Sequence, residues 1–218
     1  HVSLQADFKQ VLPALAMPLQ VMAWQDHCLT MREQFAWRYD HPGDTIYAPL
    51  LLKQLSDALP ENTVVTSDVG QHQMWVAQHM QFQSPRNHIS SSGLGTMGFG
   101  YGAAIGAQMA LGREQRVVMF TGDGSFHMNL NEACTAVSYE LPIITVIFNN
   151  QVLGMVRQWQ SAFYGKRYSQ TDPHRKTNFV KLAEGLGLQG HHRQNRAQSQ
   201  PAFAGARQQK GPTGLAGT

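Results

Sequence analysis

The sequence predicts an α/β fold, a doubly wound parallel sheet flanked by helices. Two apolar segments, residues 116–121 and 142–148, are continuous rather than alternating in apolarity, as is usual for strands covered on both faces. The first leads into Gly122-Asp123-Gly124 and the second into Asn149-Asn150. The 24 residues between these motifs (125–148) are enough for one helix and one strand, so both motifs are expected at the carboxyl edge of one sheet.

The other elements follow in chain order. Residues 1–20 are apolar with two prolines and are expected to end a preceding middle domain, and residues 21–43 are expected to form a linker. The core domain is predicted over residues 44–188, with its first helix over residues 46–59, where aliphatic side chains recur at helical spacing. Strands are then expected over residues 63–67, 116–121 and 142–148, and helices over residues 71–80, 98–111 and 125–139.

Residues 189–218 differ in composition from the rest of the chain. They contain six Gln and five Gly, no Asp or Glu, and little aliphatic pattern. A closing strand and helix are therefore not expected there, and the segment is predicted to be an aberrant, disordered tail.

The basic pI of about 9.0 does not predict a nucleic-acid partner. The formal charge is +3, and four of the 17 basic residues follow the last acidic residue, Glu184: Arg193, Arg196, Arg207 and Lys210. Without them, 13 basic residues remain against 14 acidic ones. The main body is thus not expected to offer a basic surface.

Cysteine spacing and hydropathy are the basis for predicting the cellular compartment of the protein. Cys28 and Cys134 lie far apart without a CxxC pair, which indicates neither a zinc site nor a disulfide scaffold. A reducing cytoplasm is the expected compartment. The sequence shown has no run of 18 apolar residues, so no membrane partner is predicted.

The two motifs after the buried strands have the chemistry of a metal–diphosphate site. Asp123 offers a carboxylate oxygen and Asn150 an amide oxygen, and Mg²⁺ combines a few such protein oxygens with ligand phosphates. Gly122 and Gly124 let the backbone approach a phosphate without a Cβ in the way. The helix expected from Ser125 adds free N–H groups that favour anionic charge. A GDG triplet alone also marks ordinary turns, but its pairing with Asn150 favours the site.

A nicotinamide-binding fold is an alternative. Residues 93–98 fit G-x-G-x-x-G, and Asp123 follows about 25 residues later. This alternative is disfavoured, because a ribose-binding acid normally ends a strand by itself, whereas Asp123 lies inside GDG and is paired with Asn150.

Three further motifs narrow the assignment: SDVGQHQMW over residues 67–75, SGLGTMGFG over 92–100 and LGMVRQWQ over 153–160. With GDG and NN, they resemble the thiamine diphosphate enzymes, and within these the large catalytic subunit of the acetolactate synthase (acetohydroxyacid synthase) family. The resemblance extends from about residue 1 to residue 187 and corresponds to the carboxyl-terminal part of that subunit, the pyrophosphate-type domain. Because the chain also begins at His1 without Met, it is expected to be a fragment.

The resemblance implies a role for each motif residue. Mg²⁺ would be held by Asp123, Asn150 and the backbone carbonyl of Val152. His72 would donate a charge-assisted hydrogen bond to a phosphate, and Trp159 would line the substrate pocket and favour 2-ketobutyrate. The cofactor itself would be bound by Val69, Gly70, Gln71, His72, Gly95, Met97, Gly122, Gly124, Ser125, Leu153, Gly154 and Met155.

The resemblance also implies a reaction and partners. Members of the family join pyruvate to pyruvate or to 2-ketobutyrate with release of CO₂, in branched-chain amino-acid biosynthesis. The activating glutamate and the FAD site lie in domains outside this sequence, so no catalytic residue is assigned here. A homodimer of large subunits, with a possible small regulatory subunit, is expected, and the fragment is expected to be inactive alone. Alternatives are a non-catalytic truncated product, a diphosphate-binding module, or another thiamine diphosphate carboligase or decarboxylase.

Overall fold

The chain divides into two compact units, His1–Asp40 and His41–Thr218. The computed structural model describes residues 3–41, 43–195, 197–198 and 213–217. The first unit contains helices α1 (Phe8–Leu15) and α2 (Met22–Gln34), and α1 starts where the Asp7 carboxylate accepts a hydrogen bond of 2.7 Å from the Lys9 N–H. None of residues 3–40 is buried. The assignment of this unit to a middle-domain end and a linker remains a prediction.

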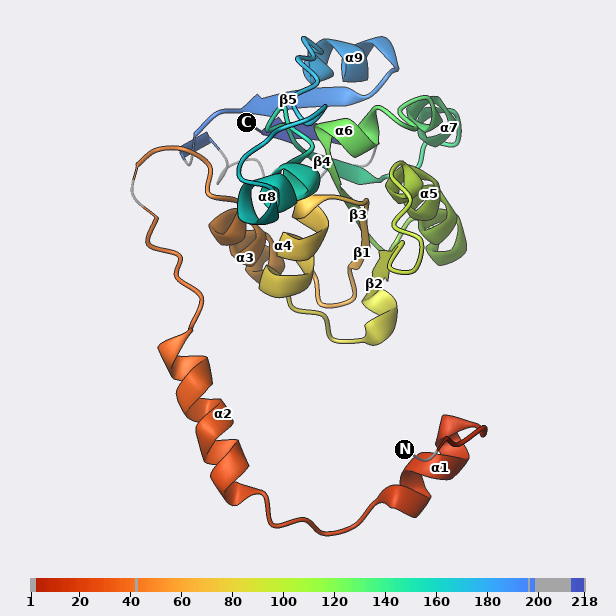
Figure 1. Cartoon of the computed structure of the whole chain (residues 1–218). Helices are drawn as coiled ribbons and strands as arrows, with labels where there is room; N and C mark the ends of the chain where they lie inside the picture. Colours follow the sequence, from red (N-terminus) through yellow and green to blue (C-terminus); the bar gives the residue numbers. More distant parts are fainter. Residues whose placement is uncertain (1–2, 42, 196, 199–212, 218) are drawn as a thin grey trace. The chain divides into compact units, whose positions relative to one another are not determined.

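The second unit is built on one sheet whose pairings are all parallel, with strand order β2-β1-β3-β4-β6-β5 (Figure 1). The strands are β1 (Val64–Ser67), β2 (His88–Ser90), β3 (Val117–Gly122), β4 (Ile144–Phe148), β5 (Gln189–Arg193) and β6 (Thr213–Gly217). Because β2 lies on one side of β1 and β3 on the other, the winding direction reverses between β1 and β3. This is the doubly wound α/β architecture, and ligands of such sheets bind where the order reverses.

Helices cover both faces of the sheet (Figure 1). One face packs against α3 (Ala48–Ala58) and α4 (Gln71–His79), and the other against α5 (Phe99–Leu111), α7 (Glu132–Ser138) and α9 (Phe179–Gly185). The remaining helical elements are the short 3₁₀ helix η1 (Pro85–Asn87), α6 (Asp123–Phe126) and α8 (Gly154–Phe163).

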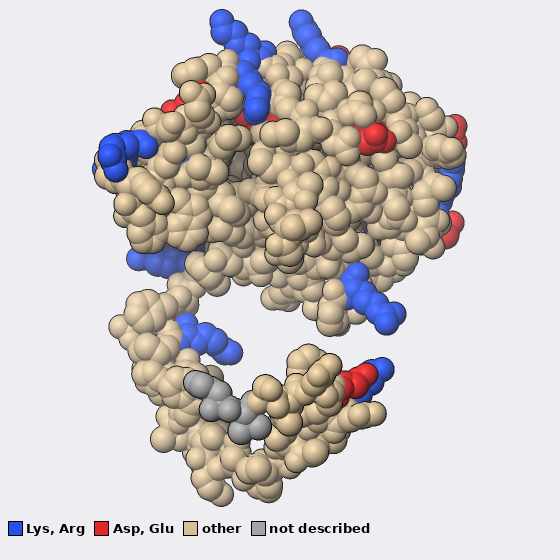
Figure 2. All heavy atoms as spheres, turned by 45° about the vertical axis from the view of Figure 1, so that its right-hand side comes forward, with Lys and Arg blue, Asp and Glu red and all other residues tan. Residues whose placement is uncertain are grey.

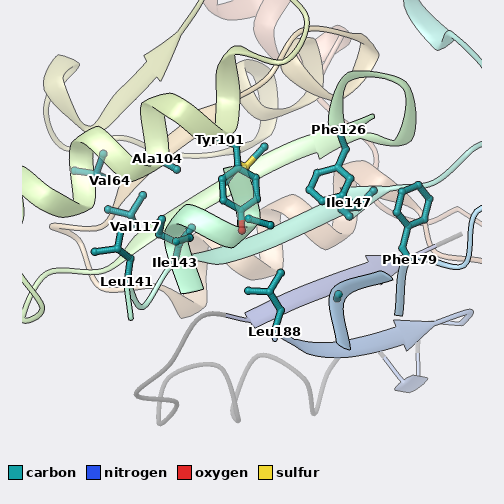
Figure 3. Close-up of a cluster of buried hydrophobic side chains, with 14 residues drawn as sticks. Val64, Tyr101, Ala104, Val117, Phe126, Leu141, Ile143, Ile147, Phe179 and Leu188 are labelled. Atoms are coloured by element: carbon teal, nitrogen blue, oxygen red, sulfur yellow. The ribbon is translucent and has the colours of Figure 1, made fainter. Parts of the chain in front are cut away.

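Successive strand residues alternate between two apolar cores. Val117 and Met119 of β3 join the core under α5, α7 and α9, whereas Val118 and Phe120 join the core under α3 and α4. Figure 3 shows the first core, in which the Tyr101 ring from α5 lies among Val117 of β3, Ile143 just before β4 and other buried apolar side chains. All four of the named β3 side chains are at most 1% exposed, which explains why this segment is continuously apolar.

The helix expected over residues 125–139 is two short helices instead, α6 and α7. The N–H groups of Met128 and Asn129 donate to the carbonyls three residues earlier, Ser125 and Phe126. This tighter pattern ends α6. The Asn129 side chain then donates to the Gly98 carbonyl at 3.2 Å, so it serves the loop before α5 rather than a helix surface.

The prediction of no closing strand after residue 188 is wrong. Gln189–Arg193 forms β5, and Thr213–Gly217 forms β6 between β4 and β5. Strand pairing uses backbone N–H and C=O groups, so a segment without an apolar pattern can still join a sheet. Of the remaining residues of the predicted tail, 196, 199–212 and 218 lie outside the described residues.

Charged side chains are scattered over the face shown in Figure 2, with Lys and Arg separated by uncharged residues rather than gathered in one patch. Among the described residues, no helix is long and apolar enough to cross a membrane.

Candidate functional site

A cavity of about 260 Å³ lies where the loops after β1, β3 and β4 meet. It is lined by every residue predicted to bind the cofactor or the metal, from Val69 to Met155 in the sequence. Three lining residues were not predicted: Trp75, Phe148 and Val156. The cavity therefore lies at the point where the winding of the sheet reverses. The individual roles of its residues remain predictions.

The first wall is the turn between β1 and α4. Gly70 has φ 153°, which L side chains rarely adopt, and a Cβ at this position would lie 2.8 Å from the His72 ring. His72 is buried, and its Nε2 has no hydrogen-bond partner among the described residues. Such an orphaned polar atom fits a site that binds a hydrogen-bonding ligand.

Burial lowers the pKa of His72 to about 4. Its imidazole is therefore neutral near pH 7, so the charge of the predicted hydrogen bond would lie on the phosphate acceptor, and that bond remains a prediction. His72 is expected to act as a neutral hydrogen-bonding group toward an anion.

The second wall is the GDG turn after β3. Asp123 is 2% exposed, and burial raises the pKa of its carboxyl, while the nearby Arg175 guanidinium acts in the opposite direction. The Ser125 hydroxyl donates a hydrogen bond of 2.5 Å to the Val69 carbonyl and so joins this wall to the first. A buried carboxylate is a suitable ligand for a cation such as Mg²⁺.

The third wall is the turn after β4. The Asn150 side-chain oxygen accepts a hydrogen bond of 3.2 Å from the Val152 N–H, and between them Gln151 has φ 59°, in the left-handed region. This tight turn holds the Asn150 side chain against the Val152 backbone N–H, and both residues line the cavity. Their roles as metal ligands remain predictions. Among the described residues, no three His, Cys, Asp or Glu side chains gather as a metal cluster, so the metal would have to complete its coordination with ligand oxygens.

At two glycines, side chains that line the cavity pack directly on the backbone. A Cβ on Gly124 would lie 2.7 Å from Leu153 Cδ2, and one on Gly154 would lie 2.6 Å from Gln71 Oε1. Any larger residue would thus push these lining side chains aside. The site thus combines glycine backbone, the His72 imidazole, whose Nε2 is unpartnered within the described part of the chain, and the buried Asp123 carboxylate. This combination is suited to binding a diphosphate through a metal ion.

Asp68 holds the walls together. Its Oδ1 accepts hydrogen bonds of 2.9 Å from the N–H groups of Val69 and Gly98, and its Oδ2 accepts one of 3.2 Å from the Thr121 hydroxyl. It is 1% exposed, and burial raises its pKa against the effect of these donors. One carboxylate therefore fixes the starts of α4 and α5 relative to β3.

Trp159 does not line the cavity. It lies on α8 with 49% of its surface exposed, and its ring stacks on Phe163 at a centroid distance of 5.2 Å. Its predicted place in a substrate pocket remains a prediction.

Comparison with known proteins agrees with this geometry. Residues 68–216 match the family model of the thiamine pyrophosphate enzyme, C-terminal TPP binding domain, so the match continues past residue 187, where the resemblance was expected to stop. The chain is 55% identical over 192 residues to the acetolactate synthase isozyme 2 large subunit of Escherichia coli (strain K12), covering 88% of this chain and 35% of that protein. It is 42% identical over 199 residues to the acetolactate synthase large subunit of Porphyra purpurea, covering 89% of this chain and 33% of that protein.

The chain spans about a third of the length of these relatives. The family model covers more than half of the chain and includes all three walls of the cavity. It thereby favours the diphosphate site over the nicotinamide alternative. The chain belongs to the thiamine pyrophosphate enzymes and carries their C-terminal TPP-binding domain.

Proposed function

We propose that this chain is the cofactor-binding part of an acetolactate synthase large subunit. In the complete enzyme it would hold thiamine diphosphate and Mg²⁺ while pyruvate is joined to a second 2-keto acid with loss of CO₂. The observation that carries the proposal is the single cavity that collects Asp123, Asn150 and the glycine turns. The similarity to acetolactate synthase large subunits supports the choice of reaction.

The residues of this chain would bind and orient rather than carry out the bond changes. Asp123, Asn150 and the Val152 carbonyl would hold the metal, and the backbone at Gly124 and the His72 imidazole would face the phosphates. Bound thiamine diphosphate would supply the electron sink for decarboxylation. Apolar lining from Met97 and Met155 would exclude water from the rings.

Activity is proposed only for an assembly with the missing parts. The chain corresponds to about a third of its relatives, and the activating glutamate and FAD site are expected outside it. A homodimer of complete large subunits, with a possible small regulatory subunit, is the proposed assembly. The isolated chain is expected to bind the cofactor without turnover.

A chimera tests this function. Residues 41–218 would replace the matching region of the Escherichia coli isozyme 2 large subunit, and acetolactate formation from pyruvate would be measured. Activity that disappears with Asp123→Ala would support the proposal. A folded, cofactor-binding chimera that forms no acetolactate would contradict it.

Trp159 offers a test of substrate choice in the same chimera. A flat apolar wall can reward one extra methylene by about 1 to 3 kcal/mol. Trp159→Leu is therefore expected to lower the preference for 2-ketobutyrate over pyruvate by roughly tenfold, measured as the ratio of the two acetohydroxy acids formed in competition. An unchanged ratio would remove Trp159 from the substrate pocket.

A further inference from the structure

Arg175 lies beside the GDG turn, although it belongs to none of the motifs that define the site. Its Nη1 is 3.6 Å from the position of a Cβ on Gly124. It lies on the same side of Gly124 as Leu153 Cδ2 and Met97 Cε, and both of those side chains line the cavity. Arg175 itself lines a neighbouring cavity with Asn149 and Gln151, and its Nη1 lies next to Gly124, whose backbone a phosphate would approach.

The Nη1 group of Arg175 is buried and has no hydrogen-bond partner among the described residues. A buried cationic donor without a partner is costly, because its lost hydration is not replaced. An incoming diphosphate would supply the missing acceptors.

The segment that carries Arg175 is fixed at its start. The Thr171 carbonyl accepts a hydrogen bond of 2.8 Å from the Leu153 N–H, and Asp172 forms an ion pair of 2.7 Å with Arg157. The Arg157 guanidinium also lies 3.9 Å from the centroid of the Tyr168 ring. These contacts attach the start of the segment to α8.

The end of the segment is attached to the GDG turn itself. His127 Nδ1 donates to the Asp123 carbonyl at 2.6 Å, since a carbonyl can only accept, and His127 Nε2 is 2.8 Å from the Thr177 hydroxyl. Arg175 is therefore held between two attachment points, so the ordering of its backbone does not have to be paid for by ligand binding.

We propose that Arg175 is a further anion-binding residue of this site, whose guanidinium donates hydrogen bonds to the diphosphate over Gly124. The inference rests on the proposed function, because it takes thiamine diphosphate as the ligand. Arginine suits this position because its planar fork can engage two phosphate oxygens at once, which a lysine cannot do.

The test is calorimetric titration of the full chain at fixed Mg²⁺ with two probes, thiamine diphosphate and inorganic pyrophosphate. Arg175→Met is expected to weaken the binding of both probes by roughly tenfold or more, the loss in affinity typical of a charge-assisted hydrogen bond. The affinity of Arg175→Lys for each probe is expected to lie between the affinities of wild type and Arg175→Met. The control Lys176→Met makes the same charge change at the neighbouring, exposed residue and is expected to stay within about twofold.

The outcomes separate the two proposals. No binding of thiamine diphosphate by the folded wild-type chain would contradict the proposed function and the role of Arg175 with it. Wild-type binding with unchanged affinity in Arg175→Met would contradict only the role of Arg175, and so would an equal loss in Lys176→Met. Should Arg175→Met fail to fold, the affinity of Arg175→Lys for the two probes is the deciding measurement. An affinity equal to that of wild type would contradict a contribution of the planar guanidinium to diphosphate binding.

Discussion

The Asp68 carboxylate connects three segments around the cavity through hydrogen bonds to Val69, Gly98 and Thr121. Asp68→Asn replaces one acceptor oxygen with a donor that would face another donor. We expect a loss of about 2 to 4 kcal/mol in the free energy of unfolding, measured by urea denaturation. The control Asp57→Asn removes an exposed ion pair with Lys53 and is expected to change stability by less than about 0.5 kcal/mol. Equal effects of the two variants would remove Asp68 from its connecting role.

His72 makes stability depend on pH. Its pKa is about 4 in the folded chain against 6.5 for the unperturbed side chain. Between these values the unfolded chain binds more protons, so stability is fully present above pH 6.5 and falls as the pH drops toward 4. The difference corresponds to roughly 3 kcal/mol.

The measurement is the free energy of unfolding of wild type and His72→Gln across that pH range. The variant is expected to lose this acid sensitivity. Asp68 and Asp123 have raised pKa values and act in the opposite direction, but both remain in the variant, so the difference isolates His72. Parallel pH curves for the two proteins would contradict the account.

The sequence predicted the cavity residues well because each wall is one short motif at the end of a strand. It missed Trp75 and Phe148, whose rings meet edge-on at a centroid distance of 6.0 Å, because apolar residues of a strand or helix read as core. Arg175, which does not line this cavity, was not predicted for a different reason. That residue lies in an irregular segment, and only its contacts in space place it at Gly124.

At the scale of elements, two glycines of α5 separate the effect of close packing on stability from the effect of helix propensity. A Cβ on Gly100 would lie 2.9 Å from Asp68 Cβ, whereas one on Gly106 would have no neighbour within 4 Å. Gly106→Ala is expected to raise the free energy of unfolding by about 0.5 to 1 kcal/mol, since alanine favours a helix interior. Gly100→Ala is expected to lower it by about 1 to 3 kcal/mol through overpacking. Thermal unfolding of both variants checks this, and a change of the same sign in the two would contradict it.

Two departures from the predicted elements arose where the side chains give no periodic signal. α6 ends early because local backbone hydrogen bonds at Met128 and Asn129 tighten its last turn. β5 is an edge strand whose residues are only partly buried, so no apolar pattern announces it. In both cases backbone hydrogen bonds determine the structure, and the side-chain pattern gives only a weak basis for predicting them.

At the scale of the whole chain, the two units are expected to be thermodynamically independent. Both apolar cores of the second unit consist only of residues after His41, so that unit has the buried surface needed to fold by itself. A chain beginning at His41 should therefore unfold in urea with a midpoint within experimental error of the full chain. A clearly lower midpoint would show that the first unit stabilises the second.

The central claim is that the second unit is a metal-dependent diphosphate site. The most direct measurement is calorimetric titration of thiamine diphosphate into the full chain, with and without Mg²⁺, for wild type and Asp123→Ala. We expect saturable binding that requires both the ion and the Asp123 carboxylate. A folded chain that does not bind, or that binds equally well without Mg²⁺ or without that carboxylate, would contradict the claim.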